Sequence, residues 1–392
     1  MIKTIGTPEG TRDRLFSECS LARQVITRAI NAFRSHGYSE LTTPNVEYYD
    51  VITATGHPLS QESMMKIIDR TGKILVMRPD NTVAIGRVAA TKLHALPLPL
   101  RLYYDQTVFR SDDINTGARS ELEQCGVELL GASGVKADLE VIALAIHVME
   151  VCGLQDYHVE IGHAGYFSCL LNKLPLSEAE KETLRDLVEK KDFVSYRYLL
   201  SDYADKEEGK ALLALPRLFG GYEVLERAKQ VCRDEEALEA ISYLESLYSV
   251  LDAAGLSDKV RFDLGLFQSI EYYTGMMFRG YGQGAGSSVL SGGRYDKLIG
   301  HFGKDMPATG FSLDVSAVTD CLPQEEHQKP AILIYYSLSH LGQAMELLRN
   351  QPKGGAMLSC SDSPEQAREE ARAIGAKKLM ILEETGVKEE WL

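Results

Sequence analysis

The sequence predicts an α+β fold in which a mostly antiparallel sheet, with helices packed on it, forms a large core followed by a small α/β domain. A β-rich pattern is interrupted at about 164–256 by polar helical sequences such as SEAEKETLRDLVEKK, and strand patterns then return. After residue 329, strand and helix patterns alternate, as in βαβ units. We therefore expect a core over 1–325, a helical insertion at about 164–256, and a separate α/β domain over 329–392.

The first half of the core shows clear helix and hairpin signals. Leu21, Val25, Ala29 and Phe33 recur at helical spacing, and Gly37 ends the run. Asp80 stands at a helix N-cap position, directly before NTVAIGRVAATKL. The remaining elements expected here are a hairpin turning at Thr71-Gly72, paired strands at 101–110 and 121–130, and a helix at 137–152.

The second half of the core should add strands to the same sheet. Their sequences are VRFDLG, IEYYTGMMFRGYG, SVLSGG and ATGFSL. A strand running through IEYYTG would direct Tyr272 and Tyr273 to opposite faces, so that one of the two rings would belong to the core.

Composition narrows the class of protein. The chain of 392 residues carries a formal net charge of −14, which opposes a nucleic-acid backbone at long range. Its seven cysteines form no CxxC pair, and its histidines form no ligand-like cluster. No apolar run reaches the roughly 18 residues of a membrane span, and the polar N-terminus is unlike a signal peptide. We expect a cytoplasmic protein with no cofactor, no metal site, no membrane partner and no nucleic-acid partner.

Four segments hold residue types that a core does not need. They are 78-RPDNT-82, Arg110 with Gln124 and Glu128 on the expected hairpin, 271-EYYTG-275, and 291-SGGRYDKLIG-300. Each also has a structural explanation. Asp80 could be only a helix cap, Arg110 and Glu128 an ion pair, and Gly292-Gly293 a plain turn.

Taken in order, these segments resemble the catalytic core of class II aminoacyl-tRNA synthetases, and specifically histidyl-tRNA synthetase, from about residue 5 to 320. RPDNT stands where the synthetases have RPEGT, and EYYTG resembles their DYYTG. The other matching features are GTRD at 10–13, the helix-strand unit that ends at Pro44, FRSDD, and GGRYD.

The resemblance implies a pocket for histidine. Asp80, Thr82 and Gln124 would bind the α-ammonium group, which needs acceptors. Glu128, with one or both of Tyr272 and Tyr273, would bind the imidazole nitrogens. Arg110 is the one retained cation of the site, and Gln268 could donate a neutral hydrogen bond to the carboxylate.

Several phosphate-binding arginines of the synthetases are replaced. By the resemblance, their positions fall on Ala118, Gln268 and Ala317, and Arg119 lies one residue away from the first. Adenylate formation places negative charge on a phosphate in the transition state, and fixed cations must stabilise it. The sequence therefore predicts a fold without the synthetase chemistry.

The same pattern resembles a paralogous family, the regulatory subunits of ATP phosphoribosyltransferase. That resemblance implies a short catalytic subunit as partner, a dimeric core assembled as four regulatory with four catalytic subunits, and feedback sensing of free histidine. Two alternatives remain open: an active histidyl-tRNA synthetase, and a synthetase-derived protein that senses tRNA or modifies another protein. The C-terminal segment 329–392, with eight basic and nine acidic residues, predicts no basic face for tRNA.

Overall fold

The computed structural model describes residues 6–54, 61–111, 119–266, 272–324, 329–384 and 386–392. The described chain divides into two compact units, the first holding Met1–Arg14 and Glu18–Pro323, and the second Leu15–Ser17 with Gln324–Leu392. No helix in the described ranges is long and apolar enough to cross a membrane.

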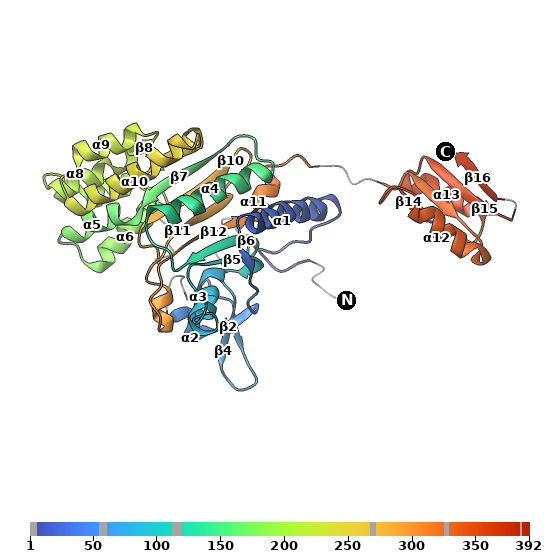
Figure 1. Cartoon of the computed structure of the whole chain (residues 1–392), viewed down its shortest axis with the longest axis horizontal. Helices are drawn as coiled ribbons and strands as arrows, with labels where there is room; N and C mark the ends of the chain where they lie inside the picture. Colours follow the sequence, from blue (N-terminus) through green and yellow to red (C-terminus); the bar gives the residue numbers. More distant parts are fainter. Residues whose placement is uncertain (1–5, 55–60, 112–118, 267–271, 325–328, 385) are drawn as a thin grey trace. The chain divides into compact units, whose positions relative to one another are not determined.

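A large, mostly antiparallel sheet organises the first unit (Figure 1). Only the pairs β1–β5 and β7–β9 are parallel among the strand pairs of this sheet that the structure describes. In their spatial order, the nine described strands are β1 (Ser39–Glu40), β5 (Leu100–Phe109), β6 (Glu121–Leu130), β12 (Ala308–Asp314), β11 (Leu290–Arg294), β10 (Met276–Gly282), β7 (Tyr157–His163), β9 (Val260–Asp263) and β8 (Phe219–Gly220).

Two long helices, α1 (Ser17–Ser35) and α4 (Val135–Val151), cover one face of this sheet. Their apolar residues recur at helical spacing and are buried against the strands. Phe33 of α1, for example, packs edge-to-face on Phe311 of β12, with ring centroids 6.0 Å apart. Apolar side chains therefore fill this face of the central sheet.

The helical insertion follows β7 and packs against α4 and β7. Its second helix begins with a reciprocal capping box, in which Ser177 and Glu180 satisfy each other's backbone N–H groups. The helices are α5 (Ala164–Lys173), α6 (Glu178–Glu189), α7 (Phe193–Leu199), α8 (Glu207–Ala214), α9 (Glu223–Val231) and α10 (Glu235–Ala253).

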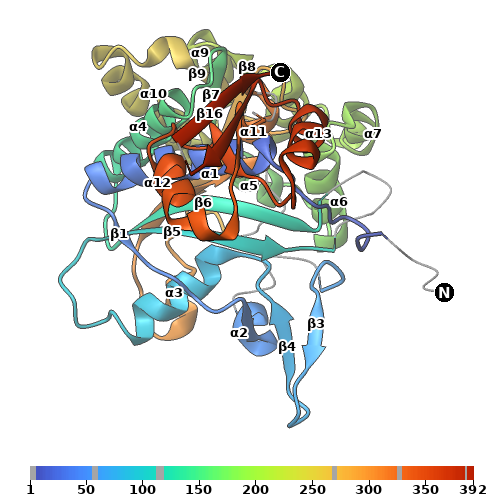
Figure 2. The same ribbon diagram turned by 90° about the vertical axis from the view of Figure 1, so that its right-hand side faces the viewer.

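A small antiparallel sheet and two helices lie beside the β5–β6 hairpin (Figure 2). A second apolar cluster, which includes Ile85, Leu102 and Leu298, joins them to the polar face of the central sheet. The elements of this region are β2 (Val46–Tyr48), α2 (Tyr49–Thr53), β3 (Lys66–Ile68), β4 (Ile74–Met77) and α3 (Asn81–Thr91). Elsewhere in the first unit, the short helix α11 (Val315–Asp320) follows β12.

The second unit is an α/β domain. Its described strands run in the order β14 (Ala356–Leu358), β13 (Ile332–Tyr335), β15 (Lys378–Glu383) and β16 (Gly386–Trp391), the first three parallel. Small residues of α13 (Pro364–Ile374) pack on one set of strand side chains, and Ala344 of α12 (Leu341–Arg349) packs on the other.

The α+β fold class is confirmed. Two details differ from the sequence-based expectation. The antiparallel β16 joins the C-terminal sheet. The strand expected to run through Tyr272 and Tyr273 does not include them, because β10 begins at Met276 and the described residues 272–275 form an irregular segment before it. Strand alternation therefore does not apply to them, and the expectation that they face opposite sides is wrong.

Candidate functional site

Strand β6 has two different faces because its side chains alternate. Gln124 and Glu128 face a cavity of about 60 Å³ on the polar side of the central sheet, and Cys125 and Val127 face the helices. The residues lining this cavity are Asp80, Thr82, Tyr104, Arg110, Gln124, Glu128, Tyr272, Tyr273, Ser291, Tyr295, Gly310, Phe311 and Ser312. We call it the hairpin pocket.

Asp80 is both a helix cap and a pocket residue. One carboxylate oxygen accepts the N–H of Val83 at 2.9 Å, which caps α3, and the other accepts the Tyr272 hydroxyl at 3.3 Å. Burial raises the pKa of Asp80, while the nearby Arg110 opposes that shift. Arg110 donates a hydrogen bond from Nε to the carbonyl oxygen of Pro79 at 2.9 Å. This bond holds the Arg110 side chain next to the residue that precedes Asp80. Asp80 can therefore be the N-cap of α3 and a residue of the hairpin pocket at the same time.

Glu128 is the most deeply buried acid of the pocket, with 2% of its surface exposed. Thr82 donates a hydrogen bond of 2.6 Å to one of its oxygens, and Tyr295 donates to the other. Burial raises the pKa of Glu128 to about 8, although both hydrogen bonds favour the ionised form. Among the described residues, Arg110 donates to the carbonyl of Pro79 and not to Glu128, whose partners are Thr82 and Tyr295. Glu128 is thus held by neutral donors that a ligand can replace.

This pKa shift predicts a pH dependence of stability. The unfolded chain releases the Glu128 proton near pH 4.5, whereas the folded chain retains it up to about pH 8. The contribution of Glu128 to stability is therefore complete below pH 4.5 and is lost as the pH rises towards 8. Urea unfolding of the wild type should show a steeper fall in the free energy of unfolding from pH 5 to pH 8 than unfolding of Glu128→Gln. Parallel pH profiles for the two proteins would contradict this assignment.

Glycines allow the strands and rings of the pocket to approach closely. A Cβ on Gly293 would lie 2.8 Å from the ring of Tyr273 and 2.6 Å from the carbonyl oxygen of Met276. A Cβ on Gly310 would overlap a carboxylate oxygen of Glu128. The glycine doublet of GGRYD lies within β11, so it is not a plain turn.

The arginine of GGRYD is directed away from the hairpin pocket. Arg294 donates to both oxygens of Asp138 on α4, at 2.6 and 3.2 Å, and to Asp296 at 2.9 Å. Asp138 is fully buried and also accepts a hydrogen bond from Tyr243. Arg294 therefore ties the sheet to α4, whereas the next residue, Tyr295, points to Glu128.

The structure brings seven of the eight residues expected at the site to the lining of the hairpin pocket. The eighth, Gln268, lies outside the described residues, as does Ala118. Ala317 lies in α11 and is nearly buried, where its N–H donates to Asp314. The sequence analysis assigned no role in the pocket to Tyr104, Ser291, Tyr295 or Ser312, although Ser291 and Tyr295 lie in the segment 291–300 that it singled out. The strand register shows which face Ser291 and Ser312 occupy.

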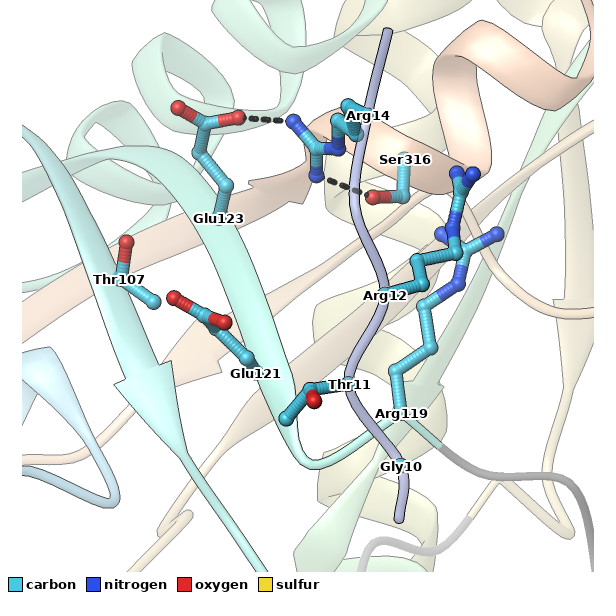
Figure 3. Close-up of a pocket in the computed structure, with 9 residues that line it drawn as sticks. All are labelled: Gly10, Thr11, Arg12, Arg14, Thr107, Arg119, Glu121, Glu123 and Ser316. Atoms are coloured by element: carbon cyan, nitrogen blue, oxygen red, sulfur yellow. Dashed lines mark hydrogen bonds and ion pairs between the residues drawn. The ribbon is translucent and has the colours of Figure 1, made fainter. Parts of the chain in front are cut away.

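A larger cavity, of about 490 Å³, lies on the opposite face of the β5–β6 hairpin (Figure 3). The segment Gly10–Arg14 runs across it, and Arg14 joins Glu123 of β6 to Ser316 of α11. Its three arginines are already paired, Arg14 with Glu123, Arg12 with Glu18, and Arg119 with Asp320. Among the described residues that line it, none is an aromatic residue that could stack on a nucleobase. These arginines therefore do not supply cations to the hairpin pocket.

In the described part of the chain, no three or more His, Cys, Asp or Glu side chains lie together in a group that could hold a metal ion.

Known proteins share this fold and these motifs. The family model of histidyl-tRNA synthetase matches residues 10–318. A histidyl-tRNA synthetase from Nostoc sp. PCC 7120 superposes over 97% of this chain and 91% of that chain, with a TM-score of 0.77 and 19% identity. A sequence identity of 19% supports only a shared fold. The fold and the pocket thus define a protein of the histidyl-tRNA synthetase-like class.

More similar sequences carry a different name. A protein of Clostridium acetobutylicum named ATP phosphoribosyltransferase regulatory subunit is 38% identical over 370 residues, 92% of this chain and 91% of that protein. Another of this name, from Acetivibrio thermocellus, is 40% identical over 84% of this chain and 79% of that protein. A crystal structure described as an ATP phosphoribosyltransferase regulatory subunit/histidyl-tRNA synthetase from Bacillus halodurans superposes with a TM-score of 0.86 and 30% identity, over 97% of this chain and 99% of that one. The chain belongs to the family of ATP phosphoribosyltransferase regulatory subunits.

Proposed function

We propose that this chain is a non-catalytic regulatory subunit that a short ATP phosphoribosyltransferase catalytic subunit needs for activity, and that it mediates inhibition by histidine, the end product of the pathway. The observation that carries the proposal is a buried polar pocket with acceptors for an amino acid but few cations for a phosphate.

The polar groups of the hairpin pocket suit histidine. Asp80, Thr82 and Gln124 offer acceptors for its α-ammonium group. Glu128 can accept from an imidazole N–H, and the Tyr272 and Tyr273 rings, with centroids 5.0 Å apart, lie beside it. The positive charge of an imidazolium would favour the ionised form of Glu128. The bonds of Thr82 and Tyr295 to Glu128 are the contacts that a ligand would replace.

The shortage of cations argues against adenylate formation. Arg110 is the one arginine among the described residues that line the hairpin pocket, and Ala317 offers no charge. Removal of a single transition-state donor typically slows an enzyme by about a hundredfold or more. The isolated chain should therefore show no histidine-dependent exchange of pyrophosphate into ATP. Exchange at a rate typical of a synthetase would favour the alternative of an active histidyl-tRNA synthetase.

Assembly provides the second test. We expect the chain to form dimers and to join the catalytic subunit in a complex of four regulatory and four catalytic chains. Mixed at micromolar concentration, the two proteins should give one large species by light scattering and raise the rate of the catalytic subunit. Separate species with an unchanged rate would contradict the proposed function.

A further inference from the structure

Strand β16 leaves one edge of the C-terminal sheet open. It stands last in the described strand order, where its inner side pairs with β15 and no described strand lies on its outer side. The N–H of Leu392 donates to the carbonyl oxygen of Lys377 at 3.1 Å. Because backbone groups alternate along an antiparallel strand, the N–H and C=O groups of Val387, Glu389 and Trp391 point outward. These groups can pair with another strand.

Two apolar side chains lie exposed along this open edge. Trp391, the one tryptophan in the sequence, has 77% of its surface exposed, and Val387 has 43%. The two share one face of β16, because side chains alternate along a strand. Lys388, Glu389 and Glu390 lie between them, and charges on an edge strand commonly prevent pairing. The charges that an incoming strand brings therefore decide whether β16 can pair.

A second copy of β16 brings complementary charges in one register. Outward backbone groups must meet outward groups, so the two-fold axis of an antiparallel pair that spans most of β16 falls at residue 388, 389 or 390. An axis at Glu389 sets Lys388 opposite Glu390 of the second copy, at two symmetric places, and Val387 opposite Trp391. Pairs of opposite charge and aromatic–β-branched pairs stabilise neighbouring strands. An axis at residue 388 or 390 offers no pair of opposite charges.

The like charges at the Glu389 axis are compensated within each chain. Glu389 Oε2 lies 2.6 Å from Nζ of Lys378 on β15. On the face that α13 covers, Arg368 donates to both oxygens of Glu390, at 2.7 and 2.9 Å, which fixes this carboxylate beside the edge. We propose that β16 pairs antiparallel with β16 of a second copy of this chain, with Glu389 on the two-fold axis, and joins two C-terminal sheets into one. This contact adds to the dimer expected of the core and does not depend on the proposed function.

Disulfide trapping in the full chain tests the pairing and its register. The exposed Cys19 and Cys360 are replaced by serine, and Glu389 is replaced by cysteine. In the proposed register, the two Cα atoms at position 389 lie about 5.5 Å apart, a separation that a disulfide can span. Mild oxidation should therefore convert most of the chain to a covalent dimer on a non-reducing gel.

Val387→Cys in the same background is the matched control. Position 387 lies on the same face of the strand, but its two copies would stand about 14 Å apart along the pair, at roughly 3.4 Å per residue. This variant should form little covalent dimer. Equal trapping at both positions, or none at either, would overturn the pairing and leave the proposed function intact.

Charge reversal provides a second test. Lys388→Glu would set two acids opposite each other at both symmetric places, so it should remove most of the trapping by Glu389→Cys. Lys353→Glu, the same change at another exposed position of the C-terminal unit, should leave trapping unchanged. Pairing would also cover Trp391, so its fluorescence in the wild type should lie at a shorter wavelength than in Lys388→Glu. Identical emission, or trapping that survives Lys388→Glu, would contradict the pairing.

Discussion

Replacing Arg294 by methionine should lower the free energy of unfolding of the first unit by about 3–5 kcal/mol. The change keeps an apolar stem of similar length but removes the guanidinium that donates to both oxygens of Asp138. Asp138 is fully buried and would keep only the hydroxyl of Tyr243 among these partners. Removing one member of a buried ion pair is costly because it leaves an uncompensated charge. Urea unfolding followed by circular dichroism measures the loss.

Arg185→Met is the matched control for this change. Arg185 lies on α6 of the same unit and pairs with Glu182, whose side chain is 54% exposed. An exposed pair three residues apart on a helix contributes well under about 1 kcal/mol. A loss for Arg294→Met as small as that for Arg185→Met would contradict the structural role of Arg294.

Glu128→Gln should weaken histidine binding by about tenfold or more and raise the histidine concentration needed for inhibition to the same extent. Glutamine keeps the shape of the side chain but cannot ionise beside an imidazolium. A hydrogen bond to a charged group contributes about 1.5–3 kcal/mol and a neutral one about 0.5–1.5 kcal/mol. A difference near 1.4 kcal/mol corresponds to about tenfold in affinity. Assembly and uninhibited activity should remain unchanged, because Glu128 is buried away from the surface.

Glu123→Gln provides a control on the same strand. Glu123 lies five residues earlier on the opposite face of β6, where it pairs with Arg14. Its replacement should leave histidine binding unchanged in isothermal titration calorimetry. If Glu128→Gln also binds histidine normally, the sensing site lies elsewhere and the hairpin pocket is a remnant of the synthetase ancestor.

Local sequence patterns predict much of this fold. The apolar spacing around Val25 and Phe33 indicates α1, and the cap at Asp80 marks the start of α3. Strand edges are less predictable, because pairing with a neighbour decides where a strand begins. The apolar, aromatic-rich run around Tyr272 resembles a strand, yet the strand register of β10 begins at Met276 with β7 and at Met277 with β11.

The residues of the candidate site are likewise predictable only in part. Residues in recognisable motifs, such as Asp80, Gln124 and Glu128, are predictable from the sequence alone. Ser312 is not, since it is an ordinary strand residue until the register across β11 and β12 places it at the pocket. The motif GGRYD does not reveal the separate roles of its residues. Its arginine binds Asp138 of α4, whereas its tyrosine donates to Glu128 in the pocket.

The most direct test of the account is the rate of phosphoribosyl transfer by a short catalytic subunit, measured with and without this chain over a titration of histidine. The proposed function predicts little activity from either protein alone, full activity from the mixture, and a fall in rate as histidine is added. The histidine concentration needed for half-inhibition should be higher by about tenfold in mixtures with Glu128→Gln. A rate that is the same with and without this chain, or one that histidine does not lower, would contradict it.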